Sequence, residues 1–305
     1  MIVIDGWGVS DASCTELDAI AAAPTPNMTQ LQHNSLYTTL VAHGSDVGLP
    51  AGLMGNSEVG HLNIGAGRIV YQDITRIDRA FQDGTFKEKL LLHLSRDKHI
   101  HLVGLVSDGG VHSSLEHLLR ITEMLQDYSF TIHAITDGRD TAPKSAMTYL
   151  RQVYPHLGTV VGRYYAMDRD KRWERIHIAL DAFTTTGPQD LKDQFSSLEE
   201  LDRLVNVKYE SNETDEFFKP IFRTGSRRIQ PDDTVLFFNF RSDRMRQIVS
   251  KFADMKRTGK LLCMTRYSEE FDLPVLSPPQ SLTNVLSECI ANANLSQCHI
   301  AGTPL

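Results

Sequence analysis

The sequence predicts an α/β fold, in which buried strands alternate with helices along the chain. Apolar runs recur that have the length of strands covered on both faces, and helical patterns follow them. The polar loops directly after these runs carry glycine, aspartate or arginine. Because ligands of such folds bind at the carboxyl ends of the strands, we expect a site in these loops.

Four apolar runs are the predicted strands. The first is residues 2–4, directly before Asp5 and two glycines. Residues 100–106 lead into Ser-Asp-Gly-Gly, and residues 130–136 lead into Asp-Gly-Arg-Asp. Residues 234–240 lead into a loop with two arginines. The intervals between the later runs are long enough for helices that cross from one strand to the next.

Helical patterns follow the predicted strands. Ser113 and the glutamate three residues later have the form of a capping box, and leucines then recur at helical spacing. The stretches 170–183 and 243–252 show the same kind of spacing. A further helix is predicted at residues 282–290.

Two composition changes suggest the domain boundaries. Residues 73–89 are rich in charge, and Ser-Pro-Pro-Gln-Ser at residues 277–281 has the composition of a linker. We therefore expect a large middle domain at residues 75–280. It is inserted between two pieces of another domain, at residues 1–74 and 281–305.

The composition narrows the class of protein. The 305 residues suffice for one large domain or two ordinary ones, and 41% hydrophobic and 23% charged residues are typical of a soluble globular protein. A net charge of −7 argues against general nucleic-acid binding. The cysteines at 14, 263, 289 and 298 form no CxxC pair, so neither a disulfide framework nor a zinc ribbon is expected. With no apolar run of about 18 residues and no signal peptide, we expect a cytoplasmic protein that does not bind membranes. A monomer is the expected oligomeric state.

Asp5 lies directly after the first predicted strand, and Gly6 and Gly8 leave its turn open. A carboxylate in such a place can bind a hard divalent cation. The alternative is an Asx turn that closes the strand, which is the commoner role of a lone aspartate at this kind of position.

Ser57 lies between two glycines in the sequence Gly-Asn-Ser-Glu-Val-Gly-His. Its hydroxyl is predicted to be exposed at a tight bend, and a following helix can direct backbone N–H groups toward an anion. A serine becomes a nucleophile when a base or a metal ion lowers its proton affinity. Because no Gly-x-Ser-x-Gly elbow is present, activation by a metal is the favoured interpretation. The alternative is that Ser57 is the N-cap of the helix.

Basic residues concentrate in four loops. These loops are residues 107–113, 137–140, 162–173 and 239–244. Arginine suits phosphate and carboxylate because its planar guanidinium makes two parallel charge-assisted hydrogen bonds. One such loop is commonly a solvated charge run, but four of them in a net acidic protein are not explained by solubility. The sequence therefore predicts a small substrate with two or three negative charges.

Taken together, the motifs resemble those of the cofactor-independent phosphoglycerate mutases of the alkaline phosphatase superfamily. GNSEVGH, SDGGVHS, DGRD, GRYYAMDRDKRW and NFRSDR occur in the family's order and approximate spacing. The resemblance extends from Met1 to about Ala301. It implies an alkaline phosphatase-like domain, incomplete here, at residues 1–74 and 281–305, and an inserted α/β transferase domain at residues 75–280.

The resemblance also implies a reaction and its residues. The family interconverts 3-phosphoglycerate and 2-phosphoglycerate, in glycolysis and gluconeogenesis, through a phosphoserine. Ser57 would be the nucleophile, and Asp5 and Ser57 would be ligands of one of two Mn²⁺ or Mg²⁺ ions. The residues that would hold phosphoglycerate are His112, Arg139, Asp140, Arg163, Arg169, Arg241 and Arg244.

The sequence departs from the family pattern near its end. The family's other metal ligands lie in an Asp-x-x-x-His pair, an Asp-His-Gly loop and a later histidine. Asp-His-Gly is absent here, and the spacing from Asp108 to His112 belongs to the substrate loop. We therefore expect the 305-residue chain to lack mutase activity. Two alternatives stay open: a non-catalytic short form that binds phosphoglycerate or a protein partner, and a metal-dependent phosphohydrolase.

Overall fold

A computed structural model describes four stretches of the chain, residues 1–9, 18–184, 193–255 and 259–300. The chain divides into two compact units: Met1–Gln72 with Ser281–Leu305, and Asp73–Gln280. The assignment of these units to a phosphatase-like domain and an inserted domain stays a prediction. None of the described helices has the length and apolar character needed to cross a membrane.

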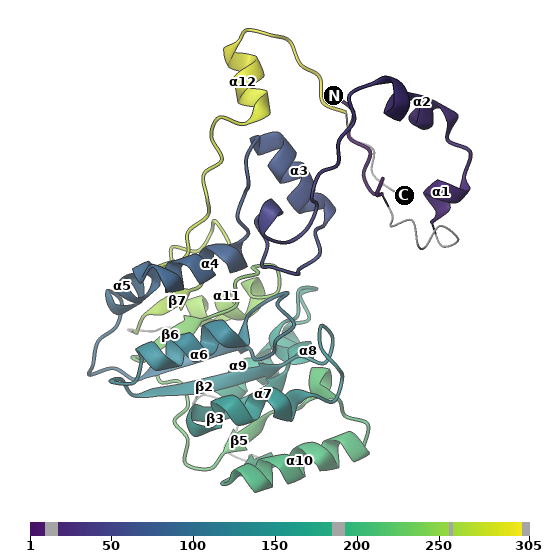
Figure 1. The fold of residues 1–305 in the computed structure, drawn as a ribbon. Helices are drawn as coiled ribbons and strands as arrows, with labels where there is room; N and C mark the ends of the chain where they lie inside the picture. The colour runs from purple at the N-terminus through teal and green to yellow at the C-terminus, as the bar shows by residue number, and fades with distance from the viewer. Residues whose placement is uncertain (10–17, 185–192, 256–258, 301–305) are drawn as a thin grey trace. The chain divides into compact units, whose positions relative to one another are not determined.

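A seven-stranded sheet forms the centre of the second unit (Figure 1). Its order is β4-β5-β3-β2-β1-β6-β7. The strands are β1 (Ile100–Leu105), β2 (Phe130–Thr136), β3 (Leu157–Gly162), β4 (Asp193–Phe195), β5 (Ile221–Arg223), β6 (Thr234–Phe237) and β7 (Leu261–Cys263). Among the described residues β3 and β5 pair antiparallel, and the other neighbouring strands pair parallel. The predicted α/β fold is confirmed, with a mixed sheet.

Helices cover both faces of this sheet. They are α4 (Asp73–Gln82), α5 (Thr85–Leu91), α6 (Leu115–Met124), α7 (Ala146–Val153), α8 (Arg163–Ala166), α9 (Trp173–Phe183), α10 (Leu198–Glu210) and α11 (Arg246–Asp254). One core joins α4–α7 and α10 to the face that includes Leu102. The other joins α9 and α11 to the face that includes Val103. Consecutive residues of β1 thus contribute to opposite cores, which explains why Leu102 and Val103 are both apolar although they lie on opposite faces of the sheet.

The predicted strands at residues 100–106 and 130–136 are confirmed, because every residue of β1 and β2 is buried and paired in register from Ile100 opposite Phe130. The strand predicted at residues 234–240 ends at Phe237. The chain then leaves the sheet to form a loop of the site described below.

The predicted capping box at Ser113 is wrong by one residue. The N-cap of α6 is Ser114, whose side chain accepts a hydrogen bond from the backbone N–H of His117 at 3.3 Å. The Ser113 hydroxyl is buried and donates to the carbonyl oxygen of Leu105 at 2.5 Å instead. Ser113 therefore ties its loop to the end of β1, a contact that only the folded chain creates.

The first unit contains helices and no described strand. Its elements are α1 (Ala19–Ala22), α2 (Pro26–Asn34), η2 (Gly44–Val47), α3 (Ser57–Ala66) and α12 (Leu286–Asn292). The predicted strand at residues 2–4 is wrong: Ile2 is 89% exposed, and these residues are unpaired. A strand requires a hydrogen-bonded neighbour, and the described part of this unit offers none. The helix predicted at residues 282–290 begins later, at Leu286.

Candidate functional site

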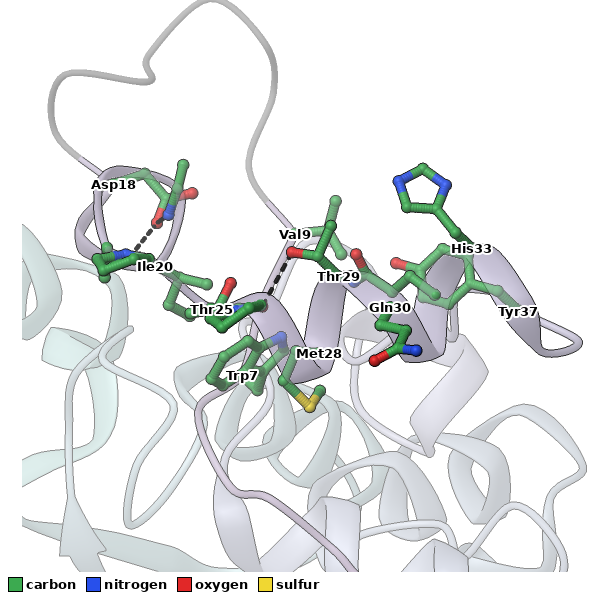
Figure 2. Close-up of a pocket in the computed structure, with 16 residues that line it drawn as sticks. Trp7, Val9, Asp18, Ile20, Thr25, Met28, Thr29, Gln30, His33 and Tyr37 are labelled. Carbon is green, nitrogen blue, oxygen red and sulfur yellow. Dashed lines mark hydrogen bonds between the residues drawn. The ribbon is translucent and has the colours of Figure 1, made fainter.

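The first unit contains a cavity of about 920 Å³ beside α1 and α2 (Figure 2). Trp7, Met28 and Tyr37 contribute apolar and aromatic surface to its wall. Asp18, which accepts a hydrogen bond from the backbone N–H of Ile20 as the N-cap of α1, is its acidic residue. No lysine or arginine lies in the described wall, so this cavity lacks the cations that an anionic substrate requires.

Ser57 is exposed at the first position of α3. The N-cap is Asn56, whose side chain accepts a hydrogen bond from the backbone N–H of Val59 at 3.0 Å, so the alternative interpretation of Ser57 as the N-cap is wrong. Nδ1 of His61 lies 3.3 Å from the Ser57 hydroxyl and 2.8 Å from the Ser57 carbonyl oxygen. The shorter contact occupies this nitrogen as a donor, so His61 is not placed as a base for the hydroxyl.

Asp5 is also exposed, in a turn where Gly6 has a φ of +75°. The described residues bring together no group of three or more His, Cys, Asp or Glu side chains that could hold a metal ion. A carboxylate and a hydroxyl alone leave most of the coordination shell of Mg²⁺ or Mn²⁺ to water. The described donor set therefore does not fit the expected pair of metal ions, and no chemical step is assigned to a metal.

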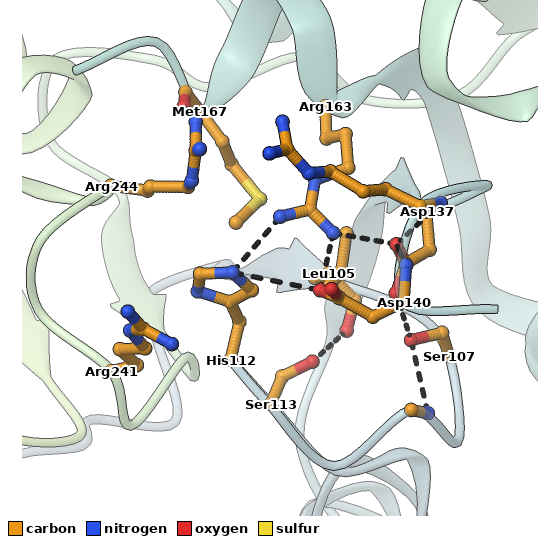
Figure 3. Close-up of polar contacts among 12 residues, drawn as sticks. Leu105, Ser107, His112, Ser113, Asp137, Asp140, Arg163, Met167, Arg241 and Arg244 are labelled. Atoms are coloured by element: carbon orange, nitrogen blue, oxygen red, sulfur yellow. Dashed lines mark hydrogen bonds and ion pairs between the residues drawn. The ribbon is translucent and has the colours of Figure 1, made fainter.

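In the second unit, the carboxyl ends of β1, β2, β3 and β6 lie at one edge of the sheet, because these strands run parallel. Their loops bring His112, Asp140 and Arg163 into direct contact (Figure 3). Arg241 and Arg244 come from the loop after β6 and lie on the other side of the His112 ring. Residues far apart in the sequence thus form one basic cluster.

Arg163, the first residue of α8, is the buried centre of this cluster, with 3% of its surface exposed. Its Nη1 donates to Oδ1 of Asp137 at 2.6 Å and to Oδ2 of Asp140 at 2.5 Å, and its Nη2 donates to Nε2 of His112 at 2.9 Å. A buried guanidinium is tolerated when its charge is paired and its donors are satisfied. These partners hold Arg163 in a single orientation.

The glycine before Arg163 permits this arrangement. A Cβ on Gly162 would lie 2.3 Å from the carbonyl oxygen of Glu216, so β3 can approach the 3₁₀ turn η4 (Asp215–Phe217) only without a side chain here. The backbone N–H of Gly162 donates to the carbonyl oxygen of Phe218 at 2.7 Å across the same contact. This close approach fixes the position at which α8 begins with Arg163.

Asp137 is a structural carboxylate whose role the sequence motifs did not indicate. Its side chain accepts hydrogen bonds from the hydroxyl of Ser107 at 2.7 Å and from the backbone N–H groups of Arg139 and Asp140 at 3.2 and 3.0 Å. Burial raises the pKa of Asp137, but these hydrogen bonds and Arg163 outweigh burial, and the pKa lies below its ordinary value. The feature of the sequence that could indicate this role is the position of Asp137 directly after the strand β2.

His112 presents an N–H without an acceptor. Because Arg163 donates to its Nε2, the neutral ring carries its proton on Nδ1. Burial, and then the positive charge of Arg163, lower the pKa of His112 to about 4, so the ring is neutral at pH 7. Its buried Nδ1 has no hydrogen-bond partner among the described residues, and the nearest carboxylate oxygen, Oδ1 of Asp243, is 4.0 Å away. An anionic ligand would satisfy this group.

A cavity of about 340 Å³ adjoins the cluster. The arginines of its wall are Arg139, Arg163, Arg169, Arg172, Arg175 and Arg244. The acidic residues of the wall are Asp168, Asp170 and Glu216. The volume suits a small ligand, and the excess of guanidinium groups favours an anion. Four of the seven predicted substrate residues line this cavity, whereas His112, Asp140 and Arg241 lie outside its described wall.

The positive charge in the cavity is only partly neutralised. Nη1 of Arg244 donates to the carbonyl oxygen of Met167 at 3.1 Å. Burial, and then the positive charges of Arg163 and Arg169, lower the pKa of Arg244, although it stays protonated at neutral pH. Arg241 is half exposed, and its Nε donates to Oδ1 of Asp243 at 3.1 Å. A ligand anion would relieve the repulsion among these guanidinium groups.

Asp168 organises the loop that carries Arg169, a role that the sequence motifs do not indicate. Its buried carboxylate accepts backbone N–H groups of Asp170 at 2.9 Å and of Arg172 at 3.0 Å. Lys171 within this loop has a φ of +61°, a left-handed conformation. The helix predicted at residues 170–183 therefore begins only after the loop. Similarly, the helix predicted at residues 243–252 begins at Arg246, after the NFRSDR loop.

Comparisons with known proteins match this chain to one family. The family model described as the BPG-independent PGAM N-terminus matches residues 76–269. The 2,3-bisphosphoglycerate-independent phosphoglycerate mutases of Onchocerca volvulus and Caenorhabditis elegans are 42% and 43% identical to it over 99% of this chain. The matches cover 63% and 60% of those proteins. A solved structure of Leishmania mexicana phosphoglycerate mutase at low cobalt concentration matches 91% of this chain and 57% of its own chain, with a TM-score of 0.69 and 28% identity.

Proposed function

Since the chain belongs to the 2,3-bisphosphoglycerate-independent phosphoglycerate mutase family, we propose that the arginine-lined cavity of its second unit binds phosphoglycerate for the interconversion of the 3-phospho and 2-phospho isomers. The chain spans about 60% of the length of the curated relatives that it matches. The observation that carries the proposal is the concentration of arginines around one small cavity at the strand ends. We also propose that the protein is a cytoplasmic monomer.

Phosphoglycerate matches the charge of this site. It carries a phosphate and a carboxylate, and both groups accept the paired donors of arginine. Arg139, Arg169 and Arg244 line the cavity beside the fixed Arg163. The Nδ1–H of His112, which has no acceptor among the described residues, supplies a further donor in the cluster. Together these groups provide donors for both anionic ends of the ligand.

Asp140 is proposed to act as a hydrogen-bond acceptor for the ligand, whereas the arginines and His112 act as donors. Both Asp137 and Asp140 accept from Arg163, but the Asp140 side chain is 20% exposed whereas that of Asp137 is 1% exposed. Of the two carboxylates bonded to Arg163, Asp140 is therefore the one that can accept a hydrogen bond from a hydroxyl of the glycerate. Such a bond would distinguish a hydroxylated ligand from a simple phosphate.

Ser57 is the proposed phosphoryl acceptor. The P–O bond of the substrate breaks as the Ser57 oxygen bonds to phosphorus, and the released glycerate oxygen takes up the proton that Ser57 loses. The second transfer returns the phosphoryl group to the other hydroxyl of the same glycerate, and the proton of that hydroxyl returns to Ser57. The backbone N–H groups at the start of α3 favour a phosphate on this residue. We propose, on the family resemblance, that Asp5 and Ser57 are among the ligands of divalent cations. The named mutase relatives favour this reaction over phosphate hydrolysis.

Calorimetric titration of 3-phosphoglycerate into the purified chain tests the binding proposal. Arg244→Gln should weaken binding at least about tenfold, because one charge-assisted hydrogen bond contributes roughly 1.5–3 kcal/mol. Arg120→Gln is a matched control, because Arg120 pairs with Glu116 on the exposed face of α6. Equal dissociation constants for Arg244→Gln and the parent chain would remove this cavity from the proposal.

A turnover assay with Mn²⁺ tests the role of Ser57. We expect the 305-residue chain to convert 3-phosphoglycerate negligibly, because its described residues form no metal cluster that would activate the hydroxyl. Any weak activity should disappear in Ser57→Ala, with 3-phosphoglycerate binding unchanged. Rapid conversion that persists in Ser57→Ala, with contaminating enzyme excluded, would contradict the assignment of Ser57.

A further inference from the structure

Asp243 lies among three groups, His112, Arg169 and Arg241, that the family resemblance assigns to the ligand. Its Oδ1 accepts from Nε of Arg241 at 3.1 Å, and its Oδ2 accepts from Nη1 of Arg169 at 3.3 Å. The same Oδ1 faces Nδ1 of His112 at 4.0 Å. The partners come from three different loops, so the tertiary structure alone places this carboxylate between them.

The contact with His112 is incomplete. At 4.0 Å, the Asp243 oxygen is too distant for a hydrogen bond to the buried Nδ1–H. The short aspartate side chain reaches the two arginines but does not satisfy the histidine. An oxyanion that entered the cluster could approach all three donors, whereas Asp243 bonds only two.

The carboxylate carries its negative charge at neutral pH. Burial raises the pKa of Asp243, but the charges of Arg241 and Arg244, with the hydrogen bond from Arg169, outweigh burial and leave the pKa below its ordinary value. An ionised group at this place repels a second anion. A ligand anion that approaches the Arg241 Nε and Arg169 Nη1 donors therefore competes with Asp243 for them.

We propose that Asp243 is an internal counter-anion of the subsite formed by His112, Arg169 and Arg241, and that it lowers the affinity of the site for anionic ligands by competing with them. The proposal rests on the function proposed above. Asp243 offsets part of the positive charge of the two arginines while no ligand is bound, and an incoming phosphate or carboxylate displaces it.

The exposure of the groups supports displacement. The Asp243 side chain is 25% exposed, and those of Arg169 and Arg241 are about half exposed, so all three can move without opening the core. The pair of Asp137 and Arg163 differs, because both side chains are buried. A ligand is thus expected to exchange with Asp243 and to leave Asp137 in place.

Asp243→Asn tests the competition, because it removes the charge and keeps the size of the side chain. Calorimetric titration of the full chain at pH 7.5 uses two probes, inorganic phosphate and 3-phosphoglycerate. We expect the variant to bind both at least fivefold more tightly than the parent chain. Asp254→Asn is the control for net charge, because the Asp254 side chain is 70% exposed at the end of α11 and lies 3.7 Å from Lys251; it should bind both probes as the parent does.

The outcomes separate this proposal from the proposed function. Tighter phosphate binding by Asp243→Asn, with no binding of 3-phosphoglycerate to any chain, would support the competition and contradict the function. Binding of 3-phosphoglycerate by the parent, with equal or weaker binding by Asp243→Asn, would show that Asp243 only orients the arginines and would overturn the competition alone. Asp243→Ser provides a second neutral variant. Loss of the folded state in both variants, measured by thermal unfolding, would also overturn the proposal.

Discussion

Two carboxylates of one loop, Asp137 and Asp140, differ in role because they differ in burial. Both accept from Nη1 of Arg163, but Asp137 also accepts from Ser107 and from two backbone N–H groups. Asp137 therefore has all its partners within the protein and fixes the loop. Asp140 keeps access to solvent and can meet a ligand.

Arg163→Met should destabilise the second unit by about 3 kcal/mol, because removal of one partner of a buried ion pair leaves the other charge uncompensated. Here the uncompensated charge is that of Asp137. Urea unfolding measures the loss. Arg120→Met, in an exposed pair with Glu116, should cost less than about 1 kcal/mol. Similar values for the two variants would show that the buried contacts of Arg163 contribute little to stability.

At the scale of elements, histidines connect the strands of the sheet below the site. Nε2 of His101 donates to Oδ2 of Asp233 at 3.0 Å, and Nδ1 of His101 lies 2.8 Å from Nε2 of His133. Nδ1 of His133 lies 2.8 Å from the hydroxyl of Thr159. With both rings neutral, each donor in this row meets an acceptor, so β1, β2 and β3 are joined by side chains as well as by backbone.

Stability should fall as the pH decreases below about 6.5. Burial lowers the pKa of His99 to about 4 and that of His133 well below its ordinary value, and any positive charge on His101 lowers both further. Unfolded histidine has a pKa of about 6.5, so between pH 6.5 and pH 4 the unfolded chain binds protons that the folded chain does not. The free energy of unfolding, measured with urea at pH 7, 6 and 5, should decrease at each step.

His133→Gln supplies the control for this dependence. The variant should show a smaller decrease between pH 7 and pH 5, whatever its stability at pH 7. Carboxylates titrate little in that interval, because their ordinary pKa values are near 4. An unfolding free energy of the parent chain that is constant over this interval would contradict the buried, neutral state of the histidines.

The first turn of α3 is capped by the side chain of Asn56, and a substitution at this residue removes the cap. Asn56→Ala should destabilise the first turn by about 1 kcal/mol, because the backbone N–H of Val59 loses its acceptor. Faster amide hydrogen exchange in the helix that begins at Ser57 is the expected result, and Asn56→Asp should retain most of the protection. Unchanged exchange in Asn56→Ala would show that the cap does not hold Ser57 in its helical position.

The two units of the whole molecule differ in the size of their cores. The second unit has two large clusters of buried side chains, one on each face of its sheet. The described core of the first unit is the small cluster of Val47, Leu49 and Val59, whereas Ile2, Met54 and other apolar side chains of this unit are exposed. Burial of apolar surface is the main source of stability, so most of the stability lies in the second unit.

Limited proteolysis should therefore leave a resistant fragment close to residues 73–280. Cleavage requires backbone that is exposed or opens locally, and the first unit offers more of it. Mass spectrometry of the time course identifies the fragment ends. Digestion of both units at the same rate would contradict the prediction of an inserted domain that folds by itself.

The sequence by itself determined the α/β class, the strands β1 and β2 and the four loops that carry the candidate site. These features depend on local patterns, since continuous apolar runs and glycine- and arginine-rich loops are legible without knowledge of neighbours. The motifs also identified the family, and they indicated Ser57 and the seven substrate residues, whose roles stay proposals.

Only the tertiary structure decided which polar groups are satisfied and which are not. The structural role of Asp137 depends on Ser107 and Arg163, and the place of Asp243 depends on Arg169 and His112, all of which belong to other loops. The shift of the α6 cap to Ser114 and the unpaired state of residues 2–4 have the same cause. A hydrogen bond or an ion pair forms when two groups meet within about 3 Å, and the fold brings such groups together from positions that are distant in the sequence.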